Sequence, residues 1–175
     1  MSIRTKVIVI EPYNEKWKLE FEKIRDMLDS YIGDLVLSIE HVGSTSVEGL
    51  SAKPIIDIDV VMDSYDNFPE IKKRLEEAGY HHEGNLGIED REAFSYVKNR
   101  FMPYHLYVCP KDGKGYLEHI ALRNHLRTNR DAREDYAVLK TKLAKEYRYD
   151  ADTYCERKTK FIQKILNKTL YSNKS

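Results

Sequence analysis

Apolar residues recur at helical spacing at both ends of the chain. From about Asn14 to Tyr31 the pattern is that of one amphipathic helix. A second helix is expected between Pro69, which suits a first helical turn, and Gly79, which suits a C-terminal cap. Three more helical stripes follow Gly115: Leu117, Ile120 and Ala121; Tyr136, Leu139, Leu143 and Tyr147; Tyr154, Phe161, Ile165 and Leu166.

Residue patterns typical of β-strands lie between these predicted helices and before the first of them. Extended segments are expected at Val7 to Ile10, Leu35 to Val42, Ile55 to Met62, Tyr80 to Glu83, Arg91 to Lys98 and Tyr104 to Cys109. The pattern predicts an α+β fold, with a mixed, twisted sheet of about five strands and flanking helices in residues 1–113. A helical segment, at about residues 114–171, would close over the open side of the sheet. At 175 residues, the chain is expected to form a single domain.

Charge and composition narrow the function. The 29 Lys and Arg residues balance the 29 Asp and Glu residues, so long nucleic acid and anionic membranes are not the expected partners. The apolar run Val7 to Ile10 is too short for a signal peptide or a membrane helix, which favours a cytoplasmic protein. Cys109 and Cys155 form no disulfide framework or zinc motif and are expected to be ordinary thiols. The adjacent pair His81 and His82 is a weak metal motif, because neighbours on a strand point to opposite faces, and both are expected to be surface histidines.

Two acids interrupt the most apolar predicted strand. Asp57 and Asp59 are two residues apart, so their side chains leave the same face with Cα atoms about 6.6 Å apart. An unpaired carboxylate in a buried strand is costly, and two convergent carboxylates suit a small hard cation such as Mg²⁺ or Mn²⁺. The alternative is a structural ion cluster in which both acids pair with Arg or Lys from a neighbouring helix.

A turn of small residues precedes this strand. Gly43, Ser44 and Thr45 follow a predicted strand end, where a glycine and successive backbone N–H groups can cradle a phosphate. An ordinary turn explains the same residues. The acid pair a dozen residues later favours the phosphate site.

The combined pattern resembles the polymerase-β-type nucleotidyltransferase superfamily, with a Gly-Ser turn, a spacer and an Asp-x-Asp strand. More closely, the segment from His41 to Met62 (HVGSTSVEGLSAKPIIDIDVVM) resembles the GrpB-like family of that superfamily. The resemblance continues at His105 to Gly113, at Arg123 to Arg127 and at the pattern Tyr154, Lys158, Phe161, Ile162, so it covers most of the chain. It implies a nucleotidyltransferase-like domain.

The chain departs from the family pattern at two positions. Glu48 stands where the family usually has Pro, and Asn124 replaces the acid of an Arg-Asp-Tyr-Leu-Arg motif. Transferases of the superfamily also commonly carry a third carboxylate on a later strand, and none stands on Tyr104 to Cys109. On that strand His105 shares a face with Tyr107 and is the candidate base or metal ligand, although it could equally orient one of the acids or be a core histidine. Glu92 and Glu118 are further candidates.

Basic residues complete the predicted site. Lys53 leads into the acid strand, Arg123 shares a helix face with Arg127, and Lys158 lies one turn after Tyr154. Each could hold phosphate or acceptor, or be a solvated surface charge.

The resulting hypothesis is Mg²⁺-dependent nucleotidyl transfer from a nucleoside triphosphate to an unknown acceptor. Asp57 and Asp59 would hold the metal, Gly43, Ser44 and Thr45 with Lys53, Arg123 and Lys158 would bind the nucleotide, and His105 would act in catalysis. The alternatives are a non-catalytic nucleotide- or metabolite-binding module on the same fold, and a protein whose helical C-terminal segment docks a partner.

Overall fold

A mixed five-stranded sheet forms the centre of the computed structural model, which describes residues 6–98 and 100–172. The strands are β1 (Ser38–Val42), β2 (Ile56–Met62), β3 (Tyr80–Gly84), β4 (Glu92–Tyr96) and β5 (Tyr104–Pro110). Their order is β1-β2-β5-β4-β3, and β2 and β5 are parallel while the other pairs are antiparallel. The predicted α+β fold is confirmed.

Two helices cover one face of this sheet. They are α1 (Lys16–Ile32) and α2 (Phe68–Glu77), and α2 carries Pro69 in its first turn as predicted. Trp17, Ile24 and Leu28 of α1 are almost fully buried against the alternate residues of β2 that carry no charge. The main hydrophobic core therefore lies on the side of the sheet opposite the two acids.

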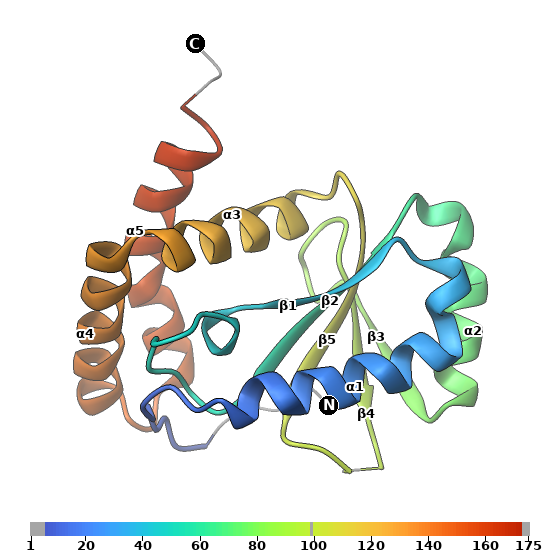
Figure 1. Ribbon diagram of the computed structural model, residues 1–175, viewed down its shortest axis with the longest axis horizontal. Coiled ribbons are helices and arrows are strands. Elements are labelled where there is room, and N and C mark those ends of the chain that lie inside the picture. The colour runs from blue at the N-terminus through green and yellow to red at the C-terminus, as the bar shows by residue number, and fades with distance from the viewer. Residues whose placement is uncertain (1–5, 99, 173–175) are drawn as a thin grey trace.

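The three C-terminal helices gather on the other side. These are α3 (Lys114–Thr128), α4 (Arg130–Glu146) and α5 (Ala151–Thr169), and α3 crosses above the sheet on the face away from α1 (Figure 1). A second core ties them to the loop before β2, through Val47, Leu50, Leu126, Tyr136 and Ile165. Asn129 separates α3 from α4 and caps α4 by accepting the Ala132 N–H. The C-terminal helices thus cover one part of the second face of the sheet.

Two expectations about local structure are wrong. The segment Val7 to Ile10 forms no strand; Ile8 is buried in a cluster with α4 and α5, and its backbone N–H bonds to Arg148. Apolar packing between helices, rather than sheet pairing, explains that short hydrophobic run. His81 is exposed as expected, but His82 is mostly buried because its imidazole contacts Phe94 and bonds to Glu92.

Candidate active site

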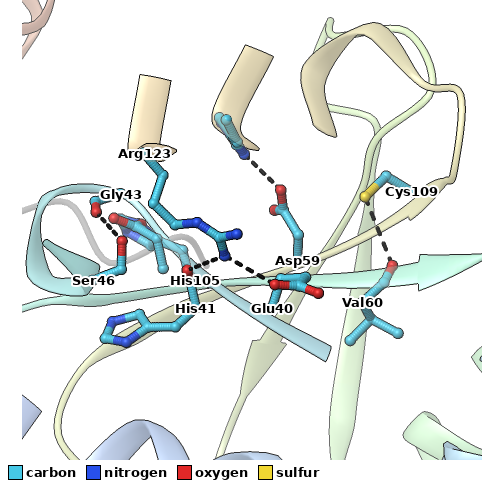
Figure 2. Close-up of polar contacts among 11 residues, drawn as sticks. Glu40, His41, Gly43, Ser46, Asp59, Val60, His105, Cys109 and Arg123 are labelled. Carbon is cyan, nitrogen blue, oxygen red and sulfur yellow. Dashed lines mark hydrogen bonds and ion pairs between the residues drawn. The ribbon is translucent and has the colours of Figure 1, made fainter. Parts of the chain in front are cut away.

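The two acids of β2 lie on the sheet face that α3 covers, each beside a histidine. In the sheet register Asp57 is opposite His105 of β5, and the His105 Nδ1–H donates to Asp57 Oδ1 over 2.8 Å. Asp59 Oδ2 accepts from Nδ1 of His119, on α3, over 2.7 Å. Figure 2 shows the Asp59 side chain rising from β2 toward α3, away from the side on which the His41 ring lies. Each acid thus has one oxygen oriented by an imidazole.

The second oxygen of Asp59 has no partner. Asp59 is 0% exposed, and its Oδ1 is buried without a hydrogen bond. A buried carboxylate oxygen without a partner is costly unless a cation or another donor occupies the position. The described residues contain no group of three or more His, Cys, Asp or Glu side chains arranged as a metal site. Asp57 and Asp59 nevertheless offer two hard oxygen atoms that make no hydrogen bond to the histidines, and Mg²⁺ commonly binds through one or two carboxylates with phosphate oxygens and waters as its other ligands.

The electrostatic environment favours the charged forms of Asp57 and His119. Burial raises the pKa of Asp57, but the hydrogen bond from His105 and the charges of His119 and Lys158 outweigh it and hold the pKa below its usual value. Burial lowers the pKa of His119, but its bond to Asp59 and the charge of Asp57 reverse the effect and raise it. The lowered pKa keeps Asp57 ionised, as a cation ligand must be.

The turn before β2 packs directly on Asp57. Gly43 has φ +71° and ψ −175°, a conformation essentially restricted to glycine, and a Cβ there would lie 2.2 Å from Asp57 Oδ2. Ser46 Oγ donates to the Gly43 carbonyl over 2.6 Å, which closes the turn (Figure 2). The hydroxyl of Thr45 donates to the Ile55 carbonyl and is bonded to His41, so it is used within the fold. Ser44 lines two pockets that also contain Asp57, and its side chain is hydrogen-bonded to the Tyr136 hydroxyl.

Three lysines line one pocket of about 200 Å³ beside Asp57. Lys53 and Lys158 hold their ammonium groups 5.5 and 4.5 Å from the ring centroid of Tyr154, and Lys140 donates to the Ser51 carbonyl. None of the three forms an ion pair with a carboxylate in the described chain. Burial and the charges of Lys158 and Lys53 lower the pKa of Lys140 to about 7. This lysine pocket is suited to a multiply charged anion.

The other predicted basic residue is part of the framework. Arg123 on α3 donates through Nη1 to Glu40 Oε2 over 2.9 Å and to the His41 carbonyl over 3.0 Å, which ties α3 to β1 (Figure 2). It also lines a second pocket of about 290 Å³ between α3 and α5, together with Gly43, Asp57 and Lys158. Arg123 therefore lies at the site while two of its bonds are structural.

The remaining acid candidates lie in different places. Glu118 lines the α3–α5 pocket and accepts from the Tyr171 hydroxyl over 2.6 Å. Glu92 pairs with His82, on the opposite side of the sheet from Asp59. Of the two, only Glu118 adjoins the site.

Sequence reasoning missed three contributors. His119 lies one helical turn before Arg123, so its i,i+4 spacing from that predicted residue was the available signal. Lys140 lies one turn after Tyr136 on α4, and from sequence alone it would be interpreted as a solvated lysine, although it is buried in the structure. Arg91 stacks its guanidinium 4.2 Å from the Tyr107 ring centroid, with a buried Nε that has no partner. Nothing in the sequence predicts that Arg91 stacks on Tyr107, which is opposite Asp59 in the sheet register.

Comparisons with known proteins agree with this architecture. Residues 7–168 match the GrpB protein family. The glutamate-rich protein GrpB of Alkalihalophilus pseudofirmus is 34% identical over 164 residues, which are 91% of this chain and 94% of that protein. The crystal structure of GrpB from Enterococcus faecalis superposes with a TM-score of 0.82 at 30% identity, over 94% of this chain and 98% of that one.

More distant structures share the fold alone. The Cid1 poly(U) polymerase superposes with a TM-score of 0.55 at 14% identity, over 78% of this chain and 44% of that one. In the part of this chain that the structure describes, no helix is long and apolar enough to cross a membrane. On the family match and the two GrpB relatives, the chain belongs to the GrpB family, with a nucleotidyltransferase-like fold.

Proposed function

We propose that this protein is a Mg²⁺-dependent nucleotidyltransferase, which moves a nucleoside monophosphate from a nucleoside triphosphate to an acceptor. The observation that carries the proposal is the position of Asp57 between the Gly43–Ser44 turn and the lysine pocket. The same Asp57 also lines the α3–α5 pocket. The Cid1 polymerase, whose fold is similar, has been crystallised with MgATP. A nucleotide donor is also consistent with the cytoplasmic location expected from the sequence.

The two acids would hold the metal through the oxygens that the histidines leave free. These are Asp57 Oδ2 and the unpartnered Asp59 Oδ1. A bound Mg²⁺ would neutralise phosphate charge and align the phosphates for in-line displacement. Because His105 and His119 fix the other oxygens, the acids need little reorganisation to bind.

The lysine pocket would hold the β- and γ-phosphates. The three lysines have no carboxylate partners, and when all three are protonated their charge matches that of a pyrophosphate group; Ser44 lies at the junction with the α3–α5 pocket. That second pocket carries Leu122, Leu126 and Ile162 on its walls and suits a nucleoside. The lysine pocket would therefore stabilise the leaving group.

The reaction balances with the groups of this chain. An acceptor hydroxyl oxygen forms a bond to the α-phosphorus while the bond from that phosphorus to the bridging oxygen of the β-phosphate breaks, and pyrophosphate leaves toward the lysines. His105 Nε2 takes the hydroxyl proton, since its Nδ1–H is already donated to Asp57. In this role His105 replaces the third carboxylate of related enzymes.

A non-catalytic binding module is the second candidate. It is favoured by β5, whose residues opposite the two acids are His105 and Tyr107, neither of which is a carboxylate. Such a module would bind the nucleotide with the same residues and release it unchanged. Release of pyrophosphate in the presence of an acceptor distinguishes the two.

Binding of the donor is tested with a matched pair of lysine variants. Lys158→Met removes one ammonium group from the pocket, whereas Lys160→Met makes the same change at an exposed position of α5. Calorimetric titration with ATP and Mg²⁺ should show affinity reduced about tenfold or more in Lys158→Met, since a charge-assisted bond contributes roughly 1.5–3 kcal/mol. Lys160→Met should bind like the wild type. Equal affinity in all three proteins would remove Lys158 from the site.

A further inference from the structure

A groove of about 770 Å³ lies between α1 and the corner that joins α3 to α4. We call it the turn groove, because it runs along the turn after β1; its walls include Tyr13, Phe21, His41, Glu48, Arg127 and Arg133. It shares only Thr45 with the lysine pocket and no residue with the α3–α5 pocket. Neither acid of β2 lines it. The turn groove is therefore distinct from the proposed donor site.

Two arginines of the turn groove are held in place by backbone carbonyls. Arg127 donates through Nε and Nη2 to the Ser46 carbonyl over 3.0 and 2.8 Å. Arg133 donates through Nη1 to the carbonyls of Leu126 and Arg127 over 3.1 and 3.3 Å, and its Nε lies 3.8 Å from where a Cβ on Gly49 would be. Both guanidinium groups thus border residues 46–49. Each keeps N–H donors that make no hydrogen bond to a described residue.

Neither arginine is neutralised by a carboxylate. Arg127 and Arg133 form no ion pair in the described chain, although Glu22 and Glu48 line the same groove. Burial lowers the pKa of Arg127, so its charge is held in a partly desolvated place. Two anchored guanidinium groups without a counter-ion are suited to bind an anion, because little order has to be imposed on them when it arrives.

The wall beside the arginines is aromatic. The buried ring of His41 stacks on the buried ring of Phe21. Tyr13 is partly exposed, and its hydroxyl makes no hydrogen bond to a described residue. Burial and the charge of Glu48 raise the pKa of that hydroxyl while the charge of Arg127 lowers it, so the hydroxyl lies within range of both charges. The anion site thus adjoins a ring that a ligand can contact.

The charges indicate which anion fits. A phosphomonoester has three terminal oxygens that can accept from two guanidinium groups at once, whereas a carboxylate has two. Glu22 and Glu48 oppose a second anionic group in the same groove, so a polyphosphate or a nucleic acid strand fits less well than a single phosphate. The Tyr13 ring favours a ligand whose remaining part is itself a ring.

We propose that the turn groove binds a small-molecule phosphomonoester, with its phosphate on Arg127 and Arg133 and a ring against Tyr13. This site goes beyond the proposed function, because these three residues hold neither the metal nor the donor. It is nevertheless connected to the donor site. Arg127 is bonded to the Ser46 carbonyl, and the Ser46 hydroxyl is bonded to Gly43 of the turn that packs on Asp57.

The test is an NMR titration of the ¹⁵N-labelled full chain with phenyl phosphate. We expect shifts of the Gly49 amide and of the side-chain Nε–Hε signals of Arg127 and Arg133. Phenol and inorganic phosphate, which each carry half of the ligand, should bind more weakly.

Matched variants assign the contacts. Arg133→Met should weaken phenyl phosphate binding about tenfold, because it removes one charge-assisted pair. Arg130→Met, an exposed change in the same helix outside the groove, should not. Glu48→Gln removes an opposing charge at an exposed position and should strengthen binding severalfold, a gain that damage to the fold would not produce.

The other outcomes contradict the proposal in different ways. No shift at the arginine signals, or shifts confined to the amides of Ser44 and Lys158, would show that phosphate does not bind in the turn groove. Equal affinity for phenyl phosphate and inorganic phosphate would refute the contact with a ring. If 5′-phosphorylated decauridylate shifts the arginine signals and phenyl phosphate does not, the ligand is a nucleic acid and the small-molecule assignment is wrong.

Discussion

His41 makes the stability of the site depend on pH. Its ring is 7% exposed, stacks 4.7 Å from the ring centroid of Phe21 and donates through Nε2 to the hydroxyl of Thr45. Burial lowers the pKa of His41 to about 4, from 6.5. The unfolded chain therefore binds a proton that the folded chain does not, and stability falls as the pH drops from 6.5 toward 4. At about 1.36 kcal/mol per pH unit, this single group removes about 3 kcal/mol from the free energy of unfolding.

The matched substitution is His41→Gln, which keeps a side-chain N–H for Thr45 and does not titrate. We expect the variant to be less stable than the wild type at pH 7.5, because it loses the ring stack on Phe21. The difference should shrink by about 2–3 kcal/mol at pH 4.5, where only the wild type has lost this contribution. Urea unfolding at both pH values measures it, with His81→Gln as the control at an exposed histidine. If the free energies of unfolding of wild type and His41→Gln differ by the same amount at both pH values, the conclusion that His41 is buried in its neutral form is wrong.

Two further predictions concern the turn and the lysine pocket. Gly43→Ala should lower the free energy of unfolding by on the order of 1–3 kcal/mol and abolish Mg²⁺-dependent nucleotide binding, because the new Cβ meets Asp57 Oδ2. Thermal unfolding measures the stability change. Gly115→Ala is the control and should lose no stability, because nothing lies within 4 Å of the added Cβ. Lys140→Met should raise the free energy of unfolding, since it removes a buried ammonium group, and should lower ATP affinity at pH 6.5. Between pH 6.5 and 9 the affinity of the wild type for ATP should fall as Lys140 loses its proton, and the affinity of Lys140→Met should fall less. Calorimetric titration across this pH range measures both. If the two affinities fall in parallel, Lys140 is excluded from the phosphate site.

The fold was predictable wherever the periodicity was carried by many residues. The stripe of α1 and the apolar run of β2 each supply several positions that agree, so their existence and type followed from sequence. The structure of Val7 to Ile10 was not predictable, because a run of four apolar residues fits a buried strand and a segment packed between helices equally well. Only the tertiary structure shows that Ile8 packs against α4 and α5.

The site was predictable where its residues are close in sequence. Asp57 and Asp59 share a face by the period of a strand, and Gly43 precedes them by one short connection. His119 and Lys140 come from helices more than fifty residues away, and helix periodicity does not say which stripe meets β2. Lys140 was hidden further because a lysine is normally solvated, and its burial is a property of how α4 packs.

Metal-dependent nucleotide binding is the central claim, and thermal unfolding with each nucleoside triphosphate, with and without Mg²⁺, tests it most directly. A ligand at about 100 times its dissociation constant adds about 2.7 kcal/mol, which corresponds to a rise in Tm on the order of 5–10 °C for a chain of this size. The account predicts that rise for the wild type only when Mg²⁺ is present, and none for Asp57→Asn. An equal rise in Asp57→Asn, or no rise with any nucleotide in the wild type, would contradict it.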